Sequence, residues 1–200
     1  PCFVLDLTAT PKKESNIISY VDAVQLKNEH MVKLPVIVYN RDSQSEVLID
    51  AIDLRNKLEE IASAEYAKTG KYIRPIALFQ AQPKGKEDAT TFEKLRDKLV
   101  DAGIPAEQIA IRTADVNELK NVELMSLSCP IRYIITVNAL KEGWDCPFAY
   151  ILASLANKTS QVDVEQILGR ILRLPHTSQH TQSALNMSYV LTSSNDFNNT

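Results

Sequence analysis

Short apolar runs and amphipathic stretches alternate along the chain. The apolar runs predict buried strands over residues 2–8, 34–40, 74–82, 108–113, 132–138, 149–156 and 188–193. Helical periodicity predicts helices over residues 45–68, 91–102 and 160–174, and one or two helical turns within 117–126. Strands that are apolar on both faces and separated by helices are typical of an α/β fold, a parallel sheet flanked by helices on both faces. Ligands of such sheets bind at the carboxyl ends of the strands.

Composition fits one soluble domain of ordinary size. Of the 200 residues, 44% are hydrophobic and 24% are charged, which supports a buried core and excludes wholesale disorder. A net charge of −3 argues against a surface coated with nucleic-acid-binding charge, although one basic groove stays compatible with it. No apolar run approaches the ~18 residues of a membrane span.

The cysteines indicate the redox environment of the chain, and its first residue bears on whether it is a fragment. Cys2, Cys129 and Cys146 form no CxxC pair, which predicts free thiols in a cytoplasmic protein and no zinc site. The sequence begins with Pro1 and runs at once into an apolar strand, so we expect it to be a piece of a longer polypeptide.

The helix predicted over 160–174 has one unusual face. Its apolar stripe lies opposite a face that carries Gln166, Gly169, Arg170 and Arg173. Glycine costs about 1 kcal/mol relative to alanine inside a helix, and neither arginine has a carboxylate four residues before it. These features suggest an outside partner with anionic groups, for which guanidinium is well suited. An ordinary amphipathic helix with a solvated basic face accounts for the pattern equally well.

The turn after the strand predicted at 132–138 carries a second candidate. Gly143 permits a tight turn, and Asp145 follows it. The carboxylate could bind ribose hydroxyls or pair with an arginine. By spacing alone, capping of its own turn is the simpler interpretation.

Three segments together resemble a known family. The runs TAT (8–10), NALKEGWDCP (138–147) and EQILGRILRLP (165–175) resemble motifs III, V and VI of superfamily-two helicases and translocases. They are most similar to the restriction (Res) subunit of type III restriction-modification enzymes. The resemblance implies a RecA-like, P-loop NTPase-type fold. Residues 14–200 would be the second motor domain, and residues 1–13 the end of the first RecA-like domain.

The resemblance also implies a nucleotide site between two RecA-like domains. The motif VI arginines match Arg170 and Arg173, which would act as catalytic arginine fingers on the γ-phosphate of ATP, with Gln166 in the same network. The motif V residues that contact the nucleotide match Gly143 and Asp145, and Gly169 lies on the same nucleotide-facing surface.

Nucleic-acid contacts are implied as well. Motif III would link hydrolysis to DNA binding through Thr8 and Thr10. The expected contacts to the phosphates of double-stranded DNA are Gln80, Thr136, Asn138 and Lys141. In the family, a separate DNA-methyltransferase (modification) subunit recognises the DNA site.

Two family motifs are missing. The chain has neither GxxxxGK[ST] nor DExx, so the phosphate cradle and the Mg²⁺ ligands are expected in a preceding domain, and the nuclease in a following one. We expect no metal site here, and neither ATP hydrolysis nor DNA cleavage by this chain alone. Two alternatives stay open. One is a non-enzymatic α/β module that holds a nucleotide or an acidic partner, and the other is a motor domain of a repair or RNA helicase.

Three further residues could carry chemistry but have simpler interpretations. His176 and His180 lie four apart in a Thr/Ser/Gln-rich stretch and are expected to be surface histidines. Cys146 has no histidine nearby in the sequence and is expected to be a small buried hydrophobe.

Overall fold

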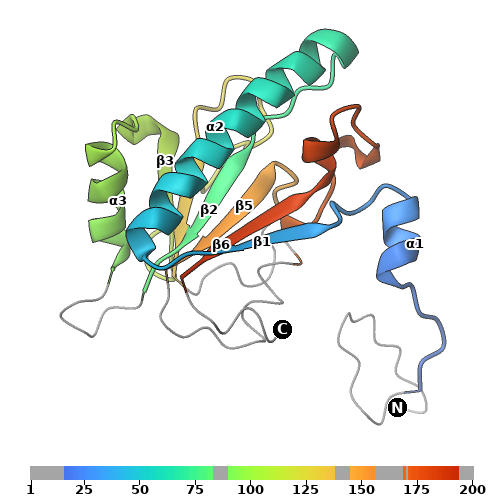
Figure 1. Ribbon diagram of the computed structural model, residues 1–200, viewed down its shortest axis with the longest axis horizontal. Coiled ribbons are helices and arrows are strands. Elements are labelled where there is room, and N and C mark those ends of the chain that lie inside the picture. Colours follow the sequence, from blue (N-terminus) through green and yellow to red (C-terminus); the bar gives the residue numbers. More distant parts are fainter. Residues whose placement is uncertain (1–15, 83–89, 138–144, 156–168, 170, 194–200) are drawn as a thin grey trace.

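A six-stranded sheet, parallel at every pairing, forms the centre of the molecule (Figure 1). The computed structural model describes residues 16–82, 90–137, 145–155, 169 and 171–193. In spatial order the strands are β1 (Val36–Asn40), β6 (Ser188–Thr192), β5 (Ala149–Ser154), β2 (Ile76–Gln80), β4 (Tyr133–Thr136) and β3 (Ile109–Arg112). The predicted parallel α/β sheet is confirmed, and it is consistent with a RecA-like fold.

Burial along the strands explains their sequence. Every residue of the four inner strands is buried, and this is why those strands are continuous apolar runs rather than alternating ones. The edge strand β1 is only partly covered, and the side chain of Val38 within it is exposed.

The longest helix, α2 (Gln44–Thr69), packs on β2, β5 and β6 (Figure 1). Ser43 caps its start by accepting a hydrogen bond from the Glu46 N–H. Gly70 ends it in the left-handed conformation, with φ at 72°. The predicted helix and its glycine stop are thus confirmed.

The other helices are shorter. α3 (Phe92–Asp101) begins at the cap Thr91, buries Leu95 and Leu99, and packs on β4. Three 3₁₀ turns complete the described elements, η1 (Ala106–Gln108), η2 (Pro175–Thr177) and η3 (Ser183–Asn186). No described helix is long and apolar enough to cross a membrane.

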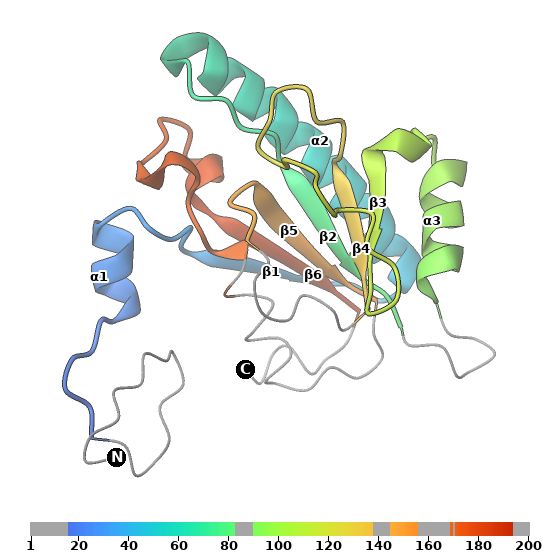
Figure 2. The ribbon, with the colours of Figure 1, turned by 180° about the vertical axis from the view of Figure 1, so that it is seen from behind.

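The sequence did not predict α1 (Ala23–Asn28). This short helix has no buried residue and stands apart from the sheet in both views (Figures 1 and 2). A capping box, in which Asp22 and Gln25 bond each other's backbone N–H groups, stabilises its first turn. Since no apolar face is buried, periodicity gave no signal for it.

Two predicted helices differ in the structure. Residues 117–126 form hydrogen-bonded turns and no helix. The helix predicted over 160–174 is helical at Gly169 and Ile171 but has ended before Arg173, which forms an antiparallel bridge with Val32. The backbone of 172–174 leaves the helix because it pairs with residues 31–33 instead. Most of that helix lies outside the described residues. The described helices that pack on the sheet are α2 and α3.

The end of α2 provides a test of the fold. We expect Gly70→Ala to lower the free energy of unfolding by about 1 kcal/mol, because alanine is strained at positive φ. No atom lies within 4 Å of the added Cβ, so a clash does not contribute. Urea unfolding measures the change, and Lys68→Arg in the preceding turn is the control, expected within about 0.5 kcal/mol of wild type. Equal stability of both variants would contradict the assigned helix end.

Candidate functional site

The two segments singled out in the sequence meet at the amino edge of the sheet. Asp145 lies just before β5, and Arg173 lies just after the helical turn at Ile171. Their side chains form an ion pair, with Arg173 Nη1 2.5 Å from Asp145 Oδ2. The pair is solvent-accessible, since the two side chains are 61% and 44% exposed. Of the two interpretations of Asp145, pairing with an arginine is therefore observed.

A third segment lies between these two. We call residues 31–34, which lead into β1, the strap. Its main chain pairs with the Arg173 segment, where Lys33 N donates to Leu172 O at 2.5 Å and Leu174 N donates to Met31 O at 3.0 Å. Its one lysine reaches the other segment, and Lys33 Nζ donates to the carbonyls of Pro147 and Ala149, both at 2.8 Å. The strap therefore connects the two segments, through its main chain to the Arg173 segment and through the buried Lys33 side chain to the Asp145 segment.

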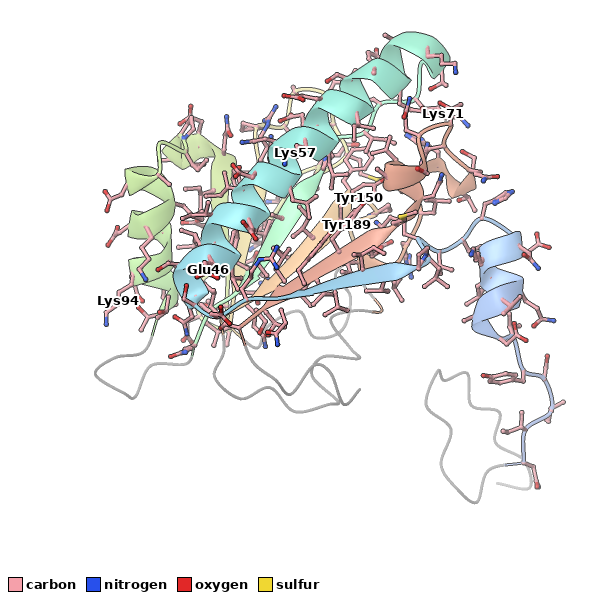
Figure 3. All side chains as sticks on the ribbon, in the orientation of Figure 1. Glu46, Lys57, Lys71, Lys94, Tyr150 and Tyr189 are labelled. Carbon is pink, nitrogen blue, oxygen red and sulfur yellow. The ribbon has the colours of Figure 1, made fainter. Side chains whose placement is uncertain are left out.

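Lys33 is a buried cation that the sequence analysis did not identify. Its side chain is completely covered, and Nζ lies 4.2 Å from the centre of the Tyr150 ring. Tyr150, labelled in Figure 3, lies on β5 in the middle of the molecule. Burial lowers the pKa of Lys33 to about 7, although Cys146 and Asp145 act in the opposite direction. A lone lysine before a strand gives no sequence signal for such burial.

Cys146 is buried, as predicted. Burial raises the pKa of its thiol to about 11, so the thiolate that a nucleophile or a metal ligand needs is disfavoured.

The prediction of two surface histidines was wrong for His180. His176 is exposed and donates from Nε2 to Tyr72 O, whereas His180 is buried, with Nδ1 3.8 Å from Glu65 Oε1. Burial lowers the pKa of His180, while Glu65 opposes the shift. The cause is tertiary: residues 178–187 fold against the end of α2, where Thr181 N donates to Glu65 at 2.9 Å. A polar stretch gives no local signal for that contact.

Two of the candidate DNA contacts lie at the opposite, carboxyl edge. Gln80 and Thr136 end β2 and β4 and are paired neighbours in the sheet. Both are buried, and Gln80 Oε1 accepts a hydrogen bond from Ser154 Oγ at 3.0 Å. Their side chains are therefore covered at the ends of these two strands.

Further polar side chains extend this edge beyond the predicted residues, of which Gln82 and Thr90 are buried and Gln44 is partly buried. Gln44 and Gln82 both donate to the carbonyl of Leu155 at 2.9 Å, and Thr90 Oγ1 lies 2.8 Å from Gln44 Oε1. Gln82 follows β2 by two positions, whereas Gln44 and Thr90 lie near the starts of α2 and α3, so they share no sequence signal.

Seven of the predicted site residues lie outside the described residues: Thr8, Thr10, Asn138, Lys141, Gly143, Gln166 and Arg170. Gly169 is described, exposed and helical. A Cβ built on it meets no atom within 4 Å, so packing within the described part of the chain does not require glycine there.

The exposed ion pair of Asp145 and Arg173 can open to bind an anion. An exposed guanidinium on an exposed carboxylate can release it for an anion such as phosphate. Within the described ranges, no group of three or more His, Cys, Asp or Glu side chains is placed to hold a metal ion. No family model and no curated protein matches the chain.

The buried lysine predicts a pH dependence. Lys33 keeps its proton up to its ordinary pKa of 10.5 when unfolded but loses it near pH 7 when folded, so the unfolded state binds more protons between these values. Stability should therefore rise with pH there, by up to about 1.4 kcal/mol per unit. The thiol of Cys146 opposes this trend only above its ordinary pKa of 9.0.

Urea unfolding from about pH 7 to 9 measures this slope, which we expect to be larger in wild type than in Lys33→Met. Arg55→Met removes another buried cation that lies over a tyrosine ring, and it should keep the wild-type slope. Parallel slopes in wild type and Lys33→Met would contradict the lowered pKa of Lys33.

Proposed function

We propose that this chain is the second RecA-like motor domain of a DNA-dependent ATPase, a helicase or translocase of the type III restriction (Res) subunit kind. The observation that carries the proposal is the contact between Asp145 and Arg173. Their segments, EGWDCP and QILGRILR, are those that the family resemblance assigns to nucleotide binding. They are distant in sequence, yet the fold brings these two side chains into one exposed pair.

The pair suits a nucleotide-dependent switch. Asp145 neutralises Arg173 and holds the guanidinium at the surface. ATP, with Mg²⁺ held by a preceding domain, would supply the negative charge that grows on the transferred phosphoryl group. Arg173 would then leave Asp145 for the γ-phosphate, with Arg170 and Gln166 beside it. Asp145 and Gly143 would be freed for the ribose. Nucleotide binding would close the two domains, and hydrolysis would reopen them.

The carboxyl edge is the proposed DNA side. Asn138 and Lys141 follow β4 and would contact DNA phosphates, with the buried Thr136 and Gln80 fixing the strand ends beneath them. Such contacts set affinity and salt dependence rather than sequence. Site recognition would belong to a methyltransferase subunit, and nuclease activity to a following domain. The proposed location is the cytoplasm.

DNA-stimulated ATP hydrolysis by the longer polypeptide tests the proposal. We expect Arg173→Ala to lower kcat at least about 100-fold, or about 3 kcal/mol of barrier, with nucleotide binding retained. The variant should fold, because an exposed ion pair contributes at most about 1 kcal/mol. Arg96→Ala is the matched control, since it removes a surface arginine paired with Glu118 at 3.0 Å and should leave turnover unchanged.

The outcomes separate the alternatives. Unchanged turnover in Arg173→Ala would contradict the arginine finger and favour a module that holds an acidic partner or a nucleotide without hydrolysis. Stimulation by RNA and not by DNA would favour an RNA helicase. Turnover by the 200-residue chain alone that Arg173→Ala abolishes would contradict the need for a preceding domain.

A further inference from the structure

Lys33 joins three separate segments of the chain. Its ammonium bonds the carbonyls of Pro147 and Ala149, and its backbone N–H bonds that of Leu172. At the start of β6, the buried Ser188 hydroxyl lies 3.4 Å from Lys33 O and 3.3 Å from Ile171 O. One residue of the strap therefore fixes the entry to β5, the end of the Ile171 turn and the entry to β6.

These contacts lie next to the exposed pair. Pro147 and Ala149 follow Asp145 by two and four positions, and Leu172 directly precedes Arg173. The two segments are thus linked twice, by the ion pair at the surface and by the contacts of Lys33 in the interior. If Arg173 releases Asp145, the inner link stays in place.

Burying a lysine side chain between the strap and the Asp145 segment is unfavourable for its charge. An ammonium taken out of water loses its hydration, and contacts with two carbonyls and one aromatic ring compensate for part of that loss. A methionine of similar length would avoid the loss but could not hold the carbonyls. The particular contribution of Lys33 is therefore geometric, because it sets where the Asp145 segment stands relative to the strap.

We propose that Lys33 is a positioning residue that holds Arg173 and Asp145 at the separation that catalysis needs. This inference rests on the proposed ATPase function.

A double-mutant cycle in the longer polypeptide tests the role. We expect Lys33→Met to lower kcat for DNA-stimulated ATP hydrolysis about tenfold or more per folded molecule, with KM for ATP changed less than about threefold, since the transition-state contact of Arg173 is misplaced. In the Arg173→Ala background the same change should lower kcat less than about twofold, because no finger is left to misplace. Arg55→Met, the matched buried cation away from the site, should have no effect per folded molecule.

A merely structural role would give the opposite pattern. Equal losses from Lys33→Met in both backgrounds, or an equal loss from Arg55→Met, would overturn the proposal. If Lys33→Met does not fold, Ser188→Ala removes a strap contact without exposing a charge. We expect it to lower kcat about threefold, and only when Arg173 is present. An equal loss without Arg173, or none, would overturn the proposal as well.

A second measurement separates this inference from the proposed function. In NMR spectra of the 200-residue chain, the Arg173 Nη–Hη signals, identified by their loss in Arg173→Ala, should move toward those of free arginine in Lys33→Met, because Nη1 makes the bond to Asp145. If the longer polypeptide shows no ATPase, the proposed function fails, while this shift still tests positioning. An unchanged signal overturns the positioning role, whatever the ATPase shows.

Discussion

The parallel sheet is the constraint on which the rest of the structure depends. When all strands point the same way, every connection must return from the carboxyl edge to the amino edge. The segments before β1, β5 and β6 therefore arrive together at the amino edge, and there the strap meets Asp145 and Arg173. The strand ends of β2 and β4 gather at the other edge. One sheet thus separates a proposed nucleotide side from a proposed DNA side.

Buried polar groups mark both edges. At the amino edge the Lys33 ammonium bonds backbone carbonyls, and the Thr181 N–H donates to Glu65. At the carboxyl edge, Ser154 donates to Gln80 where β5 and β2 end. Such groups are costly to bury, and each is directional, so they fix the positions of loops that apolar packing alone would leave less defined. We infer that the sheet supplies stability and these edge contacts supply position.

Sequence patterns predicted the elements that depend on local signals. Continuous apolar runs predicted the six described strands, and Gly70 and Thr91 marked the end of α2 and the start of α3. The strand predicted over residues 2–8 lies outside the described residues. The Asp145–Arg173 contact agrees with one alternative that the sequence left open. The role of the strap was not predictable, because Lys33 and Pro147 are 114 positions apart and their bond leaves no periodic trace. The burial of His180 was missed for the same reason, and the early helix end at Arg173 follows from its pairing with Val32.

In the proposed function, Arg173 exchanges the carboxylate of Asp145 for a phosphate. The most direct measurement is a crystal structure of the longer polypeptide with ADP, Mg²⁺ and aluminium fluoride, a mimic of the transferred phosphoryl group. We expect the Arg173 guanidinium to have left Asp145 and to lie within hydrogen-bond distance of the fluoride. Lys33 should still bond the carbonyls of Pro147 and Ala149. A bound nucleotide with Arg173 still on Asp145 and remote from the phosphates would contradict it.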